Sequence, residues 1–520
     1  MGMVAPQQRI ASAFVVCQGT YGAVTQYAQH VGVSRQWVYR QAAAVQQALT
    51  QPPEELQRLR AQVQQLQRRQ AQLEAQLACA VVLDEARQAA FATLGQARGV
   101  SLRDCQALLE LLLPGRTLRV ASLGRRTHAA GQRAGQLLAV LDELARAHVR
   151  EAAADEIYVK APVLMVVEPG SLCWVCGRLT DRATGEAWQQ EFVAWPHLEQ
   201  VTRDAGPGLA KGVHLANAQR QAQGQAPVVD QGDHFHALRG GGVALRQAEQ
   251  QARQALARAE AAQQALEACQ RQGHKQTGPA ARARHAWLQA EQAMDRWQGE
   301  ERLWQQAQQA VQLFTPTGEL NTRARAEAVL AETLPQLPDR TWAKVKRQLR
   351  QPELLNYLDR VQQQLAAVPL PEELKRAAVR QEGLRCRPHA RQGEGLSAAA
   401  LRGVLLVGAV VLSKAGAPGQ QAVAQVRALC RRAYRASSLV ECVNSVLRMH
   451  QAGQRRMTQG LLDLKRLYWN CHRFGSGRRR HSTPYQRLGI PWPDDLTWEE
   501  LLKMTPEQLR DKLSTAKPAA

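Results

Sequence analysis

Three carboxylates, Asp155, Asp204 and Glu441, have the residue type and the positions that suggest chemistry. Asp155 lies in a β-prone run, Asp204 lies where an apolar run ends at a glycine turn, and Glu441 lies in a helix-prone segment. Residues 427–487 are strongly basic, with Glu441 and Asp463 as their acids. A carboxylate within a phosphate-binding surface usually needs a divalent metal ion between the two charges. The alternative is that Glu441 pairs with a neighbouring arginine.

The chain around the two aspartates predicts a sheet. A run rich in β-branched and aromatic residues predicts three sequential strands, at 155–159, 163–167 and 172–177. We expect a fourth strand to end at Asp204 and a fifth strand at 227–230. Helices are expected near 195–200 and 209–221. Both aspartates are therefore placed on strands.

The third acid, Glu441, is placed on a helix by its apolar neighbours. Val440, Val443 and Leu447 recur at the spacing of one buried helical stripe. A helix that buries this stripe against the sheet would bring Glu441 towards the strands.

Three other acids near the strands are interpreted differently. Glu156 follows Asp155, and side chains alternate along a strand, so Glu156 is expected on the opposite face of the sheet. Asp230 is expected to cap the turn before Asp233. Asp233 is retained as the alternative to Asp204 in the acidic set.

The ordered motifs around these acids resemble the DDE transposases of bacterial insertion sequences. The resemblance is carried by short segments, in chain order Asp155-Glu156-Ile157 with 162–169, Arg203-Asp204-Ala205-Gly206-Pro207-Gly208, Asp233-His234-Phe235-His236, 438–445 and 482–489. It implies an α/β core of the retroviral-integrase or ribonuclease-H-like type, which here would contain a mixed five-stranded sheet. It also implies that Asp155, Asp204 and Glu441 are the catalytic residues and the metal ligands.

The chemistry that this resemblance implies is phosphoryl transfer at DNA phosphodiesters. Three such carboxylates can hold two Mg²⁺ ions about 3.5 to 4 Å apart, one beside the nucleophile and one beside the leaving oxygen. Mn²⁺ is expected to substitute for Mg²⁺. In the family, water first cleaves the transposon end, and the freed 3′-hydroxyl then attacks target DNA. The expected protein is a Mg²⁺-dependent DNA transposase that cleaves and transfers strands.

Basic residues that follow Glu441 are expected to bind the DNA backbone. They are Arg448, Arg455, Arg456, Arg478, Arg479 and Arg480. Each phosphate that such a residue neutralises releases condensed counterions, so binding to this surface is expected to weaken with salt.

Residues 243–425 are expected to form an all-α insertion domain, because this stretch is rich in Ala, Gln, Arg and Glu and has few β-formers. It divides the catalytic core into 151–242 and 426–490, which explains the long separation of the second and third acids. Residues 491–520 are expected to be a C-terminal tail. In transposases with such insertions the extra domain contacts the transposon end and shields the active site, and the resemblance implies the same here.

Residues 1–50 are predicted to form a helix-turn-helix DNA-binding domain. Gly32 supplies the backbone freedom of the turn, and Ser34 is expected to cap the second helix. The DNA-binding residues expected at this helix are Ser34, Arg35, Gln36, Tyr39 and Arg40. A small structural helical hairpin is the alternative.

Residues 53–78 carry the clearest periodicity in the chain. Apolar residues recur at alternating steps of three and four, with one glutamine among them, at Leu56, Leu59, Val63, Leu66, Gln70, Leu73 and Leu77. This pattern favours a coiled coil and a homodimer or higher homo-oligomer. The alternative is a long helix that packs within its own chain.

Residues 80–150 are expected to form a second helical and DNA-binding domain. A helix-turn-helix is expected at 120–137, where Arg125, Arg126, His128 and Arg133 would contact phosphates. The resemblance to transposases implies this second module, because transposon ends are often bound by two such modules.

The composition agrees with a nucleic-acid partner. A formal charge of +22 and a pI near 10.1 imply an acidic polymer, and double-stranded DNA is the expected one, rather than a membrane or a small-molecule substrate. No apolar run approaches the roughly 18 residues that span a bilayer, and no secretion signal is recognised. Ten cysteines in 520 residues fit a reducing compartment. We expect a cytoplasmic, nucleoid-associated protein.

Two other functions compete with the transposase. A dimeric, sequence-specific DNA-binding regulator would use the helix-turn-helix and the coiled coil but leaves the three acids without a role. A chromosome-organising protein would be helical and basic throughout, which the β-rich residues 153–192 disfavour. Metal-dependent cleavage of DNA separates the transposase from both.

Overall fold

The computed structural model describes residues 5–50, 54–79, 83–113, 119–386, 398–453 and 457–516. The chain divides into two compact units, Met1–Asp84 and Glu85–Ala520. Among the described residues, no helix combines the length and the apolar character needed to cross a membrane.

The first unit contains the predicted helix-turn-helix. Its helices are α1 (Pro6–Cys17), α2 (Ala23–Val31) and α3 (Arg35–Thr50). Gly32 follows α2 with a φ of 71°, the left-handed conformation that glycine adopts at no steric cost. The Ser34 hydroxyl accepts a hydrogen bond from the backbone N–H of Trp37 at 3.2 Å, so the predicted helix cap is confirmed.

The helix α4 (Glu54–Cys79) follows in the same unit. The apolar residues of its predicted seam are exposed by 39 to 66% in this single chain, and they are Leu56, Leu59, Val63, Leu66, Leu73 and Leu77. The coiled coil and the packing of this helix within its own chain both stay predictions, because α4 belongs to a unit that is described by itself.

The second unit contains one mixed five-stranded sheet in the order β3-β2-β1-β4-β5. Its strands are β1 (Glu151–Val159), β2 (Ala161–Glu168), β3 (Cys173–Leu179), β4 (Gln200–Arg203) and β5 (Val229–Gly232). The first three strands are antiparallel neighbours, whereas β4 is parallel to β1 and β5 is parallel to β4. The prediction of an α/β domain with a mixed five-stranded sheet is confirmed.

The helix predicted near 195–200 is wrong. The helix between β3 and β4 is α8 (Gly185–Val193), and the Thr184 side chain caps it by accepting from the backbone N–H of Ala187. Pro196 disfavours a helical conformation for the residue before it, so the helix cannot extend through Trp195. The predicted helix after β4 is confirmed as α9 (Pro207–Ala222).

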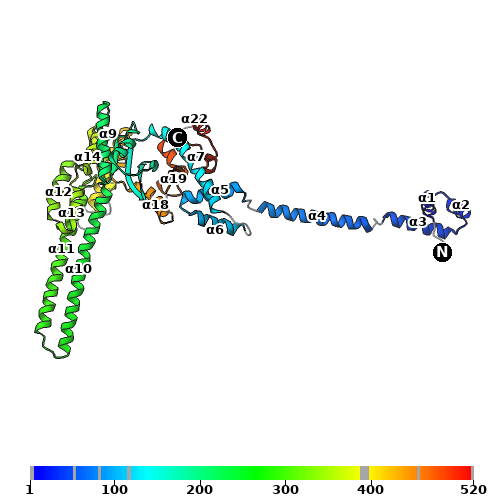
Figure 1. Ribbon diagram of the computed structural model, residues 1–520, viewed down its shortest axis with the longest axis horizontal. Coiled ribbons are helices and arrows are strands. Elements are labelled where there is room, and N and C mark those ends of the chain that lie inside the picture. Colours follow the sequence, from blue (N-terminus) through cyan, green and yellow to red (C-terminus); the bar gives the residue numbers. More distant parts are fainter. Residues whose placement is uncertain are drawn as a thin grey trace. The chain divides into compact units, whose positions relative to one another are not determined.

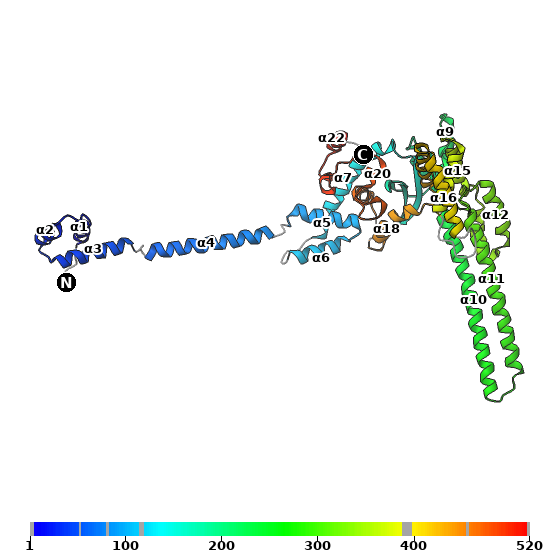
Figure 2. The same ribbon diagram turned by 180° about the vertical axis from the view of Figure 1, so that it is seen from behind.

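The two faces of the sheet are covered by different helices. Even-numbered residues of β1 and β2 pack with α8, α9 and other helices, and they are Ala152, Ala154, Leu164 and Val166. Odd-numbered residues pack against the helix α18 (Ser438–Gly453), and they are Ala153, Ile157, Val163 and Met165. In α18 the predicted stripe of Val440, Val443 and Leu447 is fully buried. Figure 2 shows α18 in orange, and it contacts β1 and β2.

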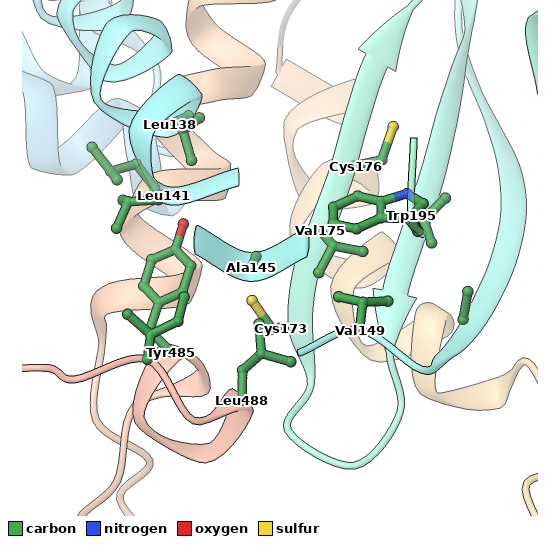
Figure 3. Close-up of a cluster of buried hydrophobic side chains, with 14 of the residues drawn as sticks. Leu138, Leu141, Ala145, Val149, Cys173, Val175, Cys176, Trp195, Tyr485 and Leu488 are labelled. Carbon is green, nitrogen blue, oxygen red and sulfur yellow. The ribbon is translucent and has the colours of Figure 1, made fainter. Parts of the chain in front are cut away.

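The predicted second helix-turn-helix is wrong, because residues 120–137 belong to one continuous helix, α7 (Val120–Arg146). Its glycines allow close packing rather than a turn: a Cβ at Gly131 would lie 2.6 Å from the carbonyl oxygen of Gly460. The helices before it are α5 (Glu85–Arg98) and α6 (Leu102–Leu112). Figure 3 shows Leu138 and Leu141 of α7 in one cluster with residues of β3, so this block shares the core of the sheet.

Residues after α18 also belong to this core. Their helices are α19 (Gln459–Cys471), η2 (Gly477–Arg479), α20 (Pro484–Leu488), α21 (Trp498–Leu501) and α22 (Pro506–Thr515). Tyr485, Trp492, Leu501 and Leu509 are buried with the side chains of α7. The prediction of a C-terminal tail is therefore wrong for residues up to 516.

The region between β5 and α18 is helical, as predicted. It contains α10 (His234–Arg271), α11 (Thr277–Ala310), α12 (Arg323–Gln336), α13 (Asp339–Leu349), η1 (Pro352–Leu355), α14 (Asn356–Ala366), α15 (Glu372–Arg385), α16 (Ala398–Lys414) and α17 (Ala417–Arg431). In Figure 1, α10 and α11 run side by side as a long hairpin. Small residues such as Ala255, Ala259 and Ala290 form part of the seam of this hairpin. The insertion also has a separate apolar core around Trp304 and Trp342.

Candidate active site

Asp155 lies in the middle of β1 on the face covered by α18, and it is 7% exposed. Its Oδ1 accepts a hydrogen bond from the backbone N–H of Glu156, and its Oδ2 accepts one from the side-chain amide of Asn444, both at 2.8 Å. Burial, with a smaller contribution from the negative charges of Asp204 and Glu441, raises the pKa of Asp155 to about 6, although the hydrogen bond from the Glu156 N–H opposes this rise. Asp155 is therefore a buried carboxyl group whose neighbours include the two other predicted acids.

Asp204 is brought beside Asp155 by the register of two parallel strands. Ala154 of β1 pairs with Arg203 of β4, so the next residues along the two strands are Asp155 and Asp204. Asp204 is half-buried, and its Oδ1 accepts a hydrogen bond from the backbone N–H of Gly206 at 2.9 Å. The glycine turn after β4 thus orients the second acid.

Glu441 lies in the first turn of α18 with its side chain 20% exposed. Its Oε2 pairs with the guanidinium of Arg448 at 2.5 Å. The alternative of a glutamate paired with a neighbouring arginine is therefore realised in this structure. Glu441 nonetheless lies close enough to Asp155 to raise the pKa of that aspartate. We call Asp155, Asp204 and Glu441 together the acidic site.

The acidic site has the donor types that Mg²⁺ prefers, because carboxylate and amide oxygens are hard ligands. Asn444 adds a buried side-chain oxygen that accepts no hydrogen bond from any residue that the structure describes. As arranged, however, the described residues include no group of three or more His, Cys, Asp or Glu side chains placed to hold a metal ion. The donors fit the ion in type, and binding would require Glu441 to leave Arg448.

Asp233 has a different role from the one considered in the sequence. Its side chain caps α10 by accepting from the backbone N–H of Phe235 at 2.7 Å, and it accepts from the N–H and the hydroxyl of Ser437 at 3.1 and 2.8 Å. It also bonds the Nδ1 atom of His236. Asp233 therefore links the start of α10 to the segment before α18, and it does not replace Asp204.

His236 extends the acidic site on the side of α10. Its hydrogen bond to Asp233 raises the pKa of the imidazole, although partial burial opposes this, and the charges of Asp155 and Asp204 raise it further. Burial acts to raise the pKa of Asp233, but its hydrogen bonds from His236 and Ser437 lower it overall. His236 was assigned no role from the sequence, although it lies in the segment Asp233-His234-Phe235-His236. A single histidine near the start of a helix has no distinctive spacing.

The other two acids near the strands have protein partners. Glu156 accepts a hydrogen bond from the indole N–H of Trp188 at 2.8 Å, on the face of the sheet that carries α8, as predicted. Asp230 pairs with the guanidinium of Arg203 at 2.6 Å. The prediction that Asp230 caps a turn is wrong, because this residue lies inside β5 and meets an arginine of the neighbouring strand.

The predicted basic residues after Glu441 differ in their environment. Arg448 is exposed and pairs with Glu441. Arg479 is partly buried and donates to the carbonyl oxygen of Pro169 at 3.4 Å, and burial lowers its pKa. Arg480 is exposed. Arg455 and Arg456 lie outside the described residues, and the side chain of Arg478 does too.

The predicted DNA-binding residues of α3 all face solvent. Ser34, Arg35, Gln36, Tyr39 and Arg40 are exposed, whereas Val38 on the same helix is fully buried. A helix whose donors point outward from a buried stripe has the form that enters a major groove.

No family model, curated protein or solved structure matches this chain. Its function is therefore inferred from the acidic site, its hydrogen-bonded neighbours and the exposed basic residues.

Proposed function

We propose that the chain is a DDE-type DNA transposase, which binds transposon ends and performs metal-dependent strand cleavage and strand transfer. The observation that carries this proposal is the meeting of Asp155, Asp204 and Glu441 from two adjacent parallel strands and the helix that covers them. The sheet order and strand directions support a ribonuclease-H-like core. Three acids near one another on one face of the sheet favour catalysis over a structural role.

In this proposal the acidic site holds Mg²⁺, or Mn²⁺ in its place, and the metal would stabilise the charge that develops on the attacking and leaving oxygens. Asp155 and Asp204 supply carboxylates held by backbone N–H groups. Glu441 exchanges its arginine partner for the shared site, which frees the exposed guanidinium of Arg448 for a DNA phosphate. Water cleaves a phosphodiester at the transposon end, and the released 3′-hydroxyl attacks a phosphodiester of the target.

DNA recognition is assigned to the first unit. The exposed donors of α3 would contact base edges and phosphates, because α3 is the second helix of a capped helix-turn-helix. The exposed apolar seam of α4 would pair with the same seam of a second copy, since six large apolar side chains on one stripe are costly to leave in water. Such a homodimer would carry two helix-turn-helix domains, one for each transposon end.

The test is Glu441→Gln, which keeps the shape of the side chain and removes its charge. We expect cleavage of DNA that carries the matching inverted repeats flanking the reading frame to be lost, with binding to the same DNA retained. Glu499→Gln, at an exposed position of α21, is the matched control and should cleave like the parent. Full nicking activity in the purified Glu441→Gln protein would contradict the proposal.

A second function is a dimeric DNA-binding regulator without catalysis. The ion pair of Glu441 with Arg448 favours it, because this pair gives the glutamate a structural partner. In that case the parent protein would bind DNA with sequence preference and show no cleavage with Mg²⁺ or Mn²⁺.

A further inference from the structure

Asn444 is a buried amide in a position where the helix pattern calls for an apolar residue. It is 1% exposed and lies on α18 between Val443 and Leu447, which are both fully buried against the sheet. A polar side chain in such a place is costly unless its hydrogen bonds are made. One side of the amide is satisfied, because Nδ2 donates to Oδ2 of Asp155 at 2.8 Å.

The other side of the amide is not satisfied. Oδ1 of Asn444 is buried and accepts no hydrogen bond from the part of the chain that the structure describes. Rotating the amide by half a turn would not help, because two acceptor oxygens would then face each other at Asp155. The charge of Asp155 therefore fixes which atom of the amide faces β1. Since both amide atoms are bonded to one carbon, the free oxygen also lies close to the Asp155 carboxylate.

The placement of Asn444 on α18 connects it with the other groups of the acidic site. Glu441, Asn444 and Arg448 are spaced by three and four residues and so form one stripe along the helix. Glu441 and Arg448 are bonded to each other, and Asn444 is bonded to β1. This polar stripe runs beside the apolar stripe that anchors the helix.

We propose that Asn444 is a neutral oxygen ligand of the divalent cation that Asp155 binds, with its N–H orienting Asp155 and its free Oδ1 contacting the ion. This inference rests on the proposed function, because it assumes that the acidic site binds a metal. The unsatisfied oxygen is then explained as a donor kept free for the ion. A neutral ligand also suits this site, since a further carboxylate would add negative charge where DNA phosphates must approach.

The test measures Mn²⁺ binding to the full-length protein without DNA, by calorimetry, so that the result does not depend on cleavage. Asn444→Ala removes both amide atoms and should weaken Mn²⁺ binding by about 10-fold or more, the usual range for a lost ligand or its support. Asn444→Asp keeps the oxygen and loses the N–H, and it should bind Mn²⁺ at least as tightly as the parent. Ser445→Ala is the matched control, because Ser445 is the exposed neighbour on α18 and its hydroxyl donates to the Cys442 carbonyl oxygen of the same helix.

The outcomes separate this inference from the proposed function. Unchanged Mn²⁺ affinity in Asn444→Ala, with affinity lost in Glu441→Gln, would overturn the ligand role of Asn444 and leave the metal site. Equal losses in Asn444→Ala and Asn444→Asp would also overturn it, because the N–H alone would then matter. A parent protein that binds no Mn²⁺ would contradict the proposed function itself. If Asn444→Ala does not fold, as judged by circular dichroism, Asn444→Leu refills the space and tests the same loss.

Discussion

The two faces of the sheet give neighbouring carboxylates, Asp155 and Glu156, different environments. Glu156 points towards α8 and receives a hydrogen bond from the Trp188 indole. Asp155 points towards α18, where the charges of Asp204 and Glu441 act against its own. Both acids accept hydrogen bonds, but only the face that carries α18 places two further acids near its buried carboxylate. A buried group whose neighbours oppose its charge is a stronger sign of function than burial or charge alone.

The largest expected effect that distinguishes the two faces is on DNA cleavage. Asp155→Asn should reduce the cleavage rate by about 10³-fold or more, because a lost metal ligand removes several kcal/mol of transition-state stabilisation. Glu156→Gln keeps an acceptor for Trp188 and should cleave within about twofold of the parent. Single-turnover cleavage of labelled end DNA measures both. Similar rates for the two variants would break the distinction between the faces.

The next effect is on stability and its dependence on pH. Folding raises the pKa of Asp155 from 3.8 to about 6, so the folded protein binds this proton more tightly than the unfolded chain. Ionising Asp155 therefore costs stability, and the cost develops as the pH rises from about 4 to 6 and is fully present above that range. Asp155→Asn should raise the free energy of unfolding at pH 7 by up to about 3 kcal/mol, and by much less at pH 4.

Urea unfolding at the two pH values, followed by tryptophan fluorescence, measures this difference. Glu156→Gln provides the reference, because it removes the neighbouring carboxylate on the other face of the sheet and leaves Asp155 in place. An equal gain for Asp155→Asn at pH 4 and pH 7 would mean that the charge of Asp155 is not its source.

The smallest effect concerns the face of the sheet that carries α8. Glu156→Leu removes the acceptor of the Trp188 N–H, and a buried unsatisfied donor costs about 1 to 2 kcal/mol. Cleavage should remain at the parent level because this face holds no acid of the site. Thermal unfolding and the cleavage assay measure the two effects, with Glu156→Gln as the control. A large loss of cleavage with little loss of stability would contradict the structural role assigned to Glu156.

The sheet and the three acids were predictable because their signals are local. β-Branched runs marked the strands, and the stripe of Val440, Val443 and Leu447 marked the buried face of α18. Asp155 lies beside Asp204 because of the parallel register of β1 and β4. A sequence pattern does not contain this register.

The features that sequence analysis missed depend on packing between distant segments. Residues 120–137 were predicted to contain a turn, but they form one helix in which Gly131 allows the close approach of Gly460, more than three hundred residues later in the chain. Asn444 is a single amide beside an apolar stripe, so it produces no periodic pattern in the sequence. Its hydrogen bond to Asp155 exists only because α18 packs on β1. Residues 491–520 were expected to be a tail, yet Leu501 and Leu509 are fully buried.

The insertion between β5 and α18 has a consequence for protein synthesis. At roughly 5 to 20 residues per second, the ribosome adds Glu441 on the order of ten seconds or more after Asp204. The helices α19 to α22, which complete the core that holds the first acid's strand, come later still. A chain that is released early therefore lacks both the third carboxylate and much of its core. Under the proposed function, the order of the chain would therefore restrict strand cleavage to finished molecules.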